Sequence, residues 1–263
     1  MFQCRIIHPN KMPTTSEDFI ASIIQAWGFD CNRIEEASDK RADFLVSDST
    51  QSYFIELKTK FESPERTTLR SGYFKSKKVF TDALGLAPTA AYRSILTKAT
   101  KQLASMSAHG KTTFRIPWLH CVGLQANVDA ERFKNLLYGS VYIADWADGG
   151  DAKPCYFFRH SIFYKYHHIV DAAIVSTEHD IWLCTNPLSQ LHKQVDKCRL
   201  AIVLAEGKIN PCQLELDDLA WIVDADVDRR DERAVLKSVM DKYGLSDRSV
   251  VMEIEEISAA SAI

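Results

Sequence analysis

Apolar and polar residues follow a helical spacing near the start of the chain. Between residues 16 and 27 the apolar side chains that recur at helical intervals are Phe19, Ile20, Ile23, Ile24 and Trp27. Thr14 or Thr15, each with an acid three residues later, forms a capping box that starts a helix, and Gly28 is suited to end it. We therefore expect a first helix over residues 16–27.

The residues that follow have the composition of β-strands. Residues 42–47 and 52–60 are rich in Phe, Val, Ile and Tyr, and residues 31–36 are a shorter candidate. The polar segment 48–51 lies between the two longer stretches and is suited to a turn. We therefore expect these two stretches to pair as an antiparallel hairpin.

A basic segment separates the hairpin from the next expected helix. Residues 61–86 show weak periodicity and many Lys, Arg, Ser and Thr side chains, so we expect a long loop or insertion there. Pro88 is suited to open a helix that runs to about residue 108 and is followed by Gly110. Its expected buried face consists of Tyr92, Ile95, Ala99, Leu103 and Met106. With an apolar strand at residues 119–126, the predicted order becomes α-β-β-β-α-β.

The second half of the chain gives weaker signals. The expected elements are helices at residues 130–137 and 229–243 and strands at residues 141–145, 155–158, 170–176, 181–185 and 200–204. No Pro-, Gly- or Ser-rich linker divides the chain. We expect one continuous α/β domain with a mixed central sheet flanked by helices. Residues 1–145 would form its core, with the insertion at about 61–87, and residues 146–263 an extension of strands and helices packed on it.

Composition supports a folded domain. The chain has 263 residues, of which 46% are hydrophobic, enough to bury a sizeable core. We expect a cytoplasmic protein, because no apolar run approaches the roughly 20 residues that span a bilayer and the first residues lack a secretion-signal pattern. The seven cysteines are scattered and never spaced as CxxC, which indicates neither a disulfide framework nor a zinc site.

Charge is distributed unevenly along the sequence. The formal net charge is only −3, but residues 56–115 contain twelve Lys and Arg against four Asp and Glu. Residues 200–263 contain seven bases against fourteen acids. The basic segment could hold a polyanion, although a solvated basic loop would have the same composition.

Two carboxylates of the expected hairpin would face each other. A turn centred between residues 49 and 50 places Asp43 opposite Glu56, where cross-strand Cβ atoms are about 4.5 to 5.5 Å apart. Two like charges at this separation favour a bound divalent cation. A register slip of one residue would instead put the two acids on opposite faces.

The neighbouring residues supply the other parts of a hydrolytic site. Strand alternation places Lys58 and Lys60 on the same face as Glu56. A Mg²⁺ ion held by the two carboxylates and the Leu57 carbonyl would bind a phosphate oxygen and activate water. The Lys58 ammonium would position that water and stabilise the developing negative charge. These are the requirements of phosphodiester hydrolysis.

The chain from about residue 14 to 126 resembles the PD-(D/E)XK nuclease superfamily, or restriction-endonuclease-like proteins. The resemblance rests on Asp43 in Arg41-Ala42-Asp43-Phe44, on Glu56-Leu57-Lys58 and on the α-β-β-β-α-β order. Ala42 replaces the proline that gives the superfamily its name. The resemblance also implies supporting roles for Glu17 on the first helix and Gln102 on the helix after the motif. Capping and the helix dipole already explain an acid at Glu17, which favours that explanation, and Gln102 could equally be a surface-edge glutamine.

The resemblance implies a Mg²⁺- or Mn²⁺-dependent endonuclease that acts on DNA in restriction, antiviral defence or repair. Asp43, Glu56 and the Leu57 carbonyl would hold the metal, and Asp43, Glu56, Lys58, Glu17 and Gln102 would form the catalytic set. The expected nucleic-acid contacts are Lys60, Lys75, Lys77, Lys78, Lys98 and Lys101. Two alternatives remain open: an inactive nucleic-acid-binding or complex-forming subunit, and an RNA-directed nuclease or toxin. A homodimer or a larger complex is compatible with each of them.

Overall fold

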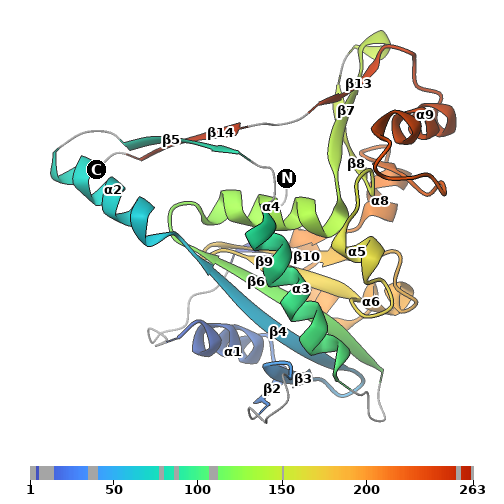
Figure 1. Cartoon of the computed structure of the whole chain (residues 1–263). Helices are drawn as coiled ribbons and strands as arrows, with labels where there is room; N and C mark the ends of the chain where they lie inside the picture. The colour runs from blue at the N-terminus through green and yellow to red at the C-terminus, as the bar shows by residue number, and fades with distance from the viewer. Residues whose placement is uncertain are drawn as a thin grey trace.

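A large mixed β-sheet forms the centre of the computed structural model, which describes residues 4–5, 15–34, 41–76, 80–85, 89–106, 112–149, 151–252 and 256–261 (Figure 1). The strand order is β1-β10-β9-β6-β4-β3-β2, and β11 pairs with β10. The strands are β1 (Cys4–Arg5), β2 (Asp30–Arg33), β3 (Phe44–Ser47), β4 (Ser52–Phe61), β6 (Thr113–Val122), β9 (Ala172–Ser176), β10 (Asp180–Thr185) and β11 (Lys208–Ile209). The expected mixed α/β architecture with helices flanking a central sheet is confirmed at this level.

The pairing of β3 with β4 follows the predicted register. The two strands are antiparallel, with Phe44 opposite Ile55 and Ser47 opposite Ser52. The turn between them is closed by Asp48, whose Oδ1 accepts hydrogen bonds from the amides of Thr50 and Gln51. β4 then runs parallel to β6, and β6 parallel to β9. The hairpin therefore belongs to the antiparallel part of the sheet, β2-β3-β4, and its second strand β4 is also the parallel neighbour of β6.

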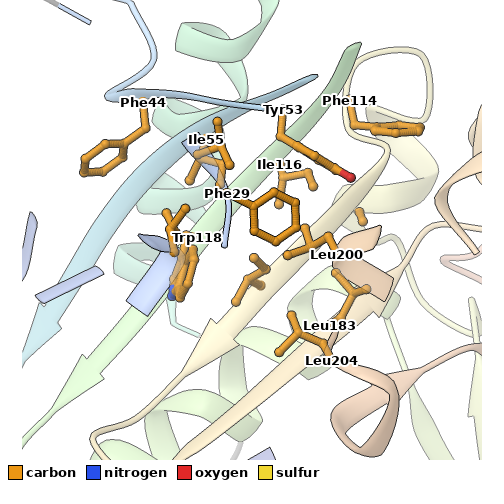
Figure 2. Packing of buried hydrophobic residues seen from close by; sticks show 14 of the residues in the cluster. Phe29, Phe44, Tyr53, Ile55, Phe114, Ile116, Trp118, Leu183, Leu200 and Leu204 are labelled. Carbon is orange, nitrogen blue, oxygen red and sulfur yellow. The ribbon is translucent and has the colours of Figure 1, made fainter. Parts of the chain in front are cut away.

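One face of the sheet is covered by α1 (Ser16–Ala26), α6 (His192–Val195) and α7 (Arg199–Val203). Alternate residues of the strands point to this side, as Tyr53 and Ile55 of β4 do. They pack with the α1 side chains Ile20, Ile23 and Ile24 in one buried cluster. Figure 2 shows part of this cluster, with Trp118 of β6 and Leu200 of α7 directed into it. Removing these large side chains from water is the main stabilising contribution on this face.

The opposite face is covered by α3 (Ala90–Ala104), α4 (Ala126–Tyr138) and α5 (Ile162–Lys165) (Figure 1). α3 lies along β4: Tyr92 near its start has Lys60 5.8 Å from its ring, and Leu103 near its end packs with Phe54. The helix therefore covers the part of β4 between Phe54 and Lys60. This is the face onto which Glu56 points.

A second sheet lies beside the first in the C-terminal part. It has the order β12-β8-β7-β13. Val235 and Val239 of α9 pack on it. Its elements and neighbours are β7 (Val141–Asp145), β8 (Ala152–Tyr156), β12 (Trp221–Ile222), β13 (Ser249–Met252), α8 (Pro211–Leu216), α9 (Glu232–Tyr243) and two short 3-10 helices, η1 (Trp146–Asp148) and η2 (Ala205–Gly207).

The segment expected to be a long loop after residue 61 contains regular structure. It forms α2 (Pro64–Lys75) and β5 (Phe80–Gly85), and β5 pairs antiparallel with β14 (Glu256–Ser261). The loop prediction was therefore wrong. α2 has no buried residue, so it lacks the apolar stripe by which helices are recognised, although Ser63 caps it and Pro64 opens it. In Figure 1 the β5–β14 ribbon stands apart from the central sheet.

Several other elements differ from expectation, and α4, for example, begins at Ala126 rather than at residue 130. β6 begins at Thr113, whereas the strand was expected from residue 119. Pro117 lies within β6, and a proline in a sequence argues against a central strand. Residues 200–204 were expected as a strand, but α7 occupies Arg199–Val203 and is capped by the Cys198 sulfur. The last long helix begins at Glu232 after its cap Asp231, not at residue 229. Among the described residues, no helix is long and apolar enough to cross a membrane.

Candidate active site

Asp43 is held rigidly at the end of the hairpin. Its amide donates to the Ile55 carbonyl over 3.1 Å, and its carbonyl accepts from the Ile34 amide over 2.9 Å. Its side chain turns toward β4, where Oδ2 accepts a hydrogen bond of 2.6 Å from the Leu57 amide. The β3–β4 register shifts by one residue here, because the Asp43 amide pairs with Ile55, which already lies opposite Phe44. Asp43 therefore does not face Glu56 in the ladder as predicted, but the two carboxylates still lie close together, since each affects the pKa of the other.

Glu56 is completely buried. Its side chain has no exposed surface, and its Oε1 accepts a hydrogen bond from the Lys58 ammonium. Its other oxygen, Oε2, is buried without a hydrogen-bond donor among the described residues when both carboxylates are charged, and the Asp43 carboxylate lies close enough to share a proton with Glu56. Burial raises the pKa of Glu56 to about 7, Lys58 opposes the rise, and the Asp43 carboxylate adds to it. Burial also raises the pKa of Asp43, although the Leu57 amide and Lys58 act in the opposite direction.

Two carboxylates with raised pKa values and an unsatisfied oxygen indicate a site that lacks positive charge. A buried carboxylate normally obtains a partner for each oxygen, because leaving one bare costs about 1–3 kcal/mol or more. Lys58 supplies one such partner, and its side chain is 27% exposed. A bound cation would supply the other and would remove the repulsion between Asp43 and Glu56.

Apolar side chains of α3 and the neighbouring strands surround Glu56. Phe54, on the same face of β4 as Glu56, packs with Ala42 and with Leu103 of α3. Pro117 of β6 lies opposite Glu56 in the parallel ladder. This environment is the reason why Glu56 is desolvated and why its pKa rises.

Glu17 lies close to Asp43 but does not cap its own helix. The cap of α1 is Thr15, which accepts a hydrogen bond from the Asp18 amide. Glu17 instead lies 3.7 Å from Arg33 on β2, and its negative charge contributes to the raised pKa of Asp43. The side-chain cap is therefore Thr15, but Glu17 lies in the first turn of α1, where the helix dipole alone favours an acid. No local pattern indicates that Arg33 would partner this acid.

Gln102 contacts the main chain that leads into Asp43. Its Nε2 donates a hydrogen bond of 3.1 Å to the carbonyl of Arg41, two residues before Asp43. The side chain is half-buried on α3. This places Gln102 in a supporting position next to the site, acting through the backbone rather than through a contact with the carboxylates.

The lysines expected to contact nucleic acid lie on three different elements. Lys60 is half-buried on β4 and donates to the Phe61 carbonyl. Lys75 is exposed on α2, and Lys98 and Lys101 are exposed on α3. Lys77 and Lys78 lie outside the described residues.

The donor set is small for a metal site. No group of three or more His, Cys, Asp or Glu side chains in the described ranges could hold a metal ion. Two carboxylates nevertheless suit Mg²⁺, which keeps several waters and is commonly held by one or two carboxylates and substrate phosphate. The Leu57 carbonyl is a further donor, since the amide and carbonyl of one strand residue point to the same edge and its amide meets Asp43. The bare Glu56 oxygen fits such an ion.

Comparison with protein-family models, with curated proteins and with solved structures gives no significant match to this chain.

Proposed function

We propose that this chain is a Mg²⁺-dependent nuclease that hydrolyses phosphodiester bonds in DNA. The observation that carries the proposal is the unpartnered, fully buried oxygen of Glu56, close to Asp43 and beside Lys58. A purely structural carboxylate at this position would have to keep a proton, and the pKa of about 7 allows this only below neutral pH. A metal site between two carboxylates, with an ammonium next to it, gives each group a chemical role.

The arrangement of elements supports a restriction-endonuclease-like core. α1, β2, β3, β4, α3 and β6 follow one another in the order that the PD-(D/E)XK superfamily would have, with α2 and β5 inserted between β4 and α3. Asp43 just before β3 and Glu56-Leu57-Lys58 on β4 support the same assignment. Ala42 in place of proline and the α2–β5 insertion are departures from the pattern.

Each residue of the proposed site would have its own role in hydrolysis. Asp43, Glu56 and the Leu57 carbonyl would hold the ion, which supplies Lewis-acid activation of water and phosphate when bound. Lys58 lies within hydrogen-bond distance of Glu56 and stabilises negative charge that develops on the phosphate. Glu17 borders Asp43 from α1, and Gln102 fixes the backbone that carries Asp43.

Purified protein incubated with plasmid DNA tests the proposal. We expect cleavage in Mg²⁺ or Mn²⁺ and none in EDTA. Asp43→Asn and Lys58→Ala should each slow cleavage at least about 100-fold. Asp241→Asn and Lys237→Ala change exposed residues of the same types on α9 and should leave the rate unchanged.

Two results would contradict it. Cleavage that survives both site substitutions would place the activity elsewhere. Divalent-independent binding without any cleavage of DNA or RNA would favour a binding module with a nuclease-like fold. Faster cleavage of RNA than of DNA would keep the chemistry and change the substrate.

A further inference from the structure

Arg132 on α4 joins three parts of the chain through one side chain. Its Nη1 donates to the Tyr92 hydroxyl over 2.9 Å and to Oδ1 of Asp129 over 3.0 Å. Its Nε donates to the main-chain carbonyl of Gly85 over 2.8 Å. Tyr92 lies in the first turn of α3, and Gly85 is the last residue of β5. One guanidinium therefore connects α3, α4 and the end of the β5–β14 ribbon.

These contacts are buried, which makes them important for the position of α3. The side chains of Arg132 and Asp129 are 12% and 3% exposed, and Tyr92 is also buried. The Tyr92 hydroxyl donates to the same Asp129 oxygen. Exposed ion pairs contribute little to stability, whereas a buried charge that loses its partner is strongly destabilising. Loss of Arg132 would leave the buried Asp129 carboxylate without its cation.

The end of α3 that Arg132 holds is the end beside Lys60. The Lys60 ammonium lies 5.8 Å from the centre of the Tyr92 ring. Lys58 and Glu56 precede Lys60 on the same face of β4, at intervals of roughly 6.6 Å. The other end of α3 packs over the start of β4. If the Tyr92 end moved away from the sheet, Lys60, Lys58 and Glu56 would become accessible in that order.

The candidate site is closed in this arrangement. Glu56 has no exposed surface, and its Oε2 is buried. A Mg²⁺ ion keeps several of its waters, so an ion with a bound phosphate needs room beside the carboxylate. Groups that cover Glu56 therefore have to move, and α3 is the helix that covers this part of β4.

We propose that Arg132 locks α3 over the candidate site and that the β5–β14 ribbon maintains the lock through the Gly85 carbonyl. Three residues separate Gly85 from Thr89, the cap residue of α3, so a shift of β5 is transmitted to the start of this helix. All six residues of β5 pair with Glu256–Ser261, and a two-stranded ribbon is marginally stable by itself. The consequence for catalysis rests on the proposed function, whereas the movement of α3 does not.

Cysteine alkylation measures the opening of this cover without metal or substrate. Cys121 of β6 has no exposed surface, lies opposite Lys60 in the parallel ladder and packs in one cluster with Tyr92. Cys198 is also buried, but in the cluster on the opposite face of the sheet. N-ethylmaleimide in EDTA, followed by peptide mass mapping, gives both rates in one sample. In Arg132→Ala we expect Cys121 to react at least about 10-fold faster and Cys198 at an unchanged rate.

Arg70→Ala is the matched control. Arg70 forms an ion pair of similar burial with Glu62, at 16% and 7% exposure, but this pair joins α2 to the residue after β4. Its loss should leave the alkylation rate of Cys121 unchanged.

Ser258→Pro and Ala259→Pro test the contribution of the ribbon. The N–H groups of neighbouring residues in an antiparallel pair point alternately toward the partner strand and away from it. One of the two prolines therefore removes a hydrogen bond to β5. That variant should speed the alkylation of Cys121 as Arg132→Ala does, and the other should have a smaller effect.

The cleavage rate at limiting Mg²⁺ gives the consequence for the site. Arg132→Ala should cleave DNA several-fold faster than the unmodified protein, whereas loss of a merely structural residue would slow cleavage. An unchanged Cys121 rate in Arg132→Ala, an equal rise at Cys198 or an equal effect of Arg70→Ala overturns the proposal. So does slower cleavage in Arg132→Ala, or a Cys121 rate that neither proline changes. Faster alkylation of Cys121 in a protein that cleaves no nucleic acid supports the lock and contradicts only the nuclease proposal.

Discussion

The Leu57 amide on β4 donates a 2.6 Å hydrogen bond to Oδ2 of Asp43, fourteen residues earlier in the chain. The bond orients the Asp43 carboxylate along the edge of β4, next to Glu56 and the Leu57 carbonyl. Rotation of this carboxylate away from Glu56 would relieve the repulsion only at the cost of that hydrogen bond. The pair therefore depends on protons or cations in the surrounding solution.

The proton on Glu56 should make stability depend on pH. Burial raises the pKa of Glu56 from 4.5 to about 7, so between these values the folded chain holds a proton that the unfolded chain has lost. The free energy of unfolding should then fall as pH rises through this window. Without metal, we expect the Tm of the unmodified protein relative to Glu56→Gln to fall by roughly 5 to 10 °C from pH 5 to 8. Scanning fluorimetry measures it, and a constant difference would contradict it.

Magnesium should reverse this loss. The ion binds the deprotonated carboxylates, so it stabilises the folded state more at pH 8 than at pH 5. We expect 10 mM Mg²⁺ to raise the Tm by several degrees at pH 8 and by little at pH 5. A rise of that size corresponds to an ion concentration of roughly ten times the Kd for Mg²⁺. In Glu56→Gln the rise should be largely lost. A Tm rise of equal size at both pH values would show that the ion binds elsewhere.

Gln102 should affect metal use more than stability. Gln102→Ala removes the hydrogen bond to the Arg41 carbonyl, which is worth about 1 kcal/mol, and loosens the backbone that carries Asp43. We expect the Mg²⁺ concentration for half-maximal cleavage to rise several-fold while DNA binding in EDTA stays unchanged. Gln213→Ala, which removes a bond to exposed Asp217 on α8, is the control and should alter neither. If Gln102→Ala and Gln213→Ala needed the same Mg²⁺ concentration for half-maximal cleavage, Gln102 would have no role in metal use.

Two threonines that precede helices should differ in their contribution to stability. Thr15 caps α1 with its side chain, whereas Thr89 at the start of α3 makes no side-chain cap hydrogen bond. Thr15→Ala should lower the free energy of unfolding by about 1 kcal/mol, and Thr89→Ala by clearly less. Urea denaturation of the two variants measures the difference. Equal losses of unfolding free energy would mean that the Thr15 side-chain cap adds no stability beyond what Thr89 contributes without a cap.

Two glycines at helix ends provide a second matched pair. Gly139 and Gly244 end α4 and α9 with φ of 61° and 66°. An added Cβ at Gly139 would lie 2.2 Å from the Arg159 carbonyl oxygen, but at Gly244 nothing lies within 4 Å. Gly244→Ala should cost about 1–2 kcal/mol, and Gly139→Ala more than about 3 kcal/mol. Denaturant midpoints measure both, and equal costs would contradict the close approach of Arg159.

The hairpin was predictable because local rules determine it. Alternating apolar residues and the polar turn at Asp48 fix the register that places Phe44 opposite Ile55. That register brings Asp43 to the neighbourhood of Glu56, but the one-residue shift at Asp43, whose amide pairs with Ile55, could not be read from the sequence. The complete burial of Glu56 does not follow, because it depends on α3, which crosses β4 from outside the hairpin.

The errors share a physical cause. α2 buries no side chain, so its sequence carries no apolar stripe, and only its cap at Ser63 and Pro64 marked it. The run at residues 200–204 is too short for apolar periodicity to separate helix from strand. Tertiary contacts such as that of Glu17 with Arg33 connect residues on different elements, and no local pattern encodes them.

The pairing of β5 with β14 has a consequence for how the chain is made. Every residue of β5 finds its partner between Glu256 and Ser261, so β5 is synthesised about 170 residues before its partner exists. At ribosomal rates of roughly 5–20 residues per second, this leaves β5 without that partner for about 10 to 30 seconds. The hairpin that carries Asp43 and Glu56 can form long before this ribbon does. During that interval the nascent chain presents an open strand edge that a chaperone or another nascent chain could occupy.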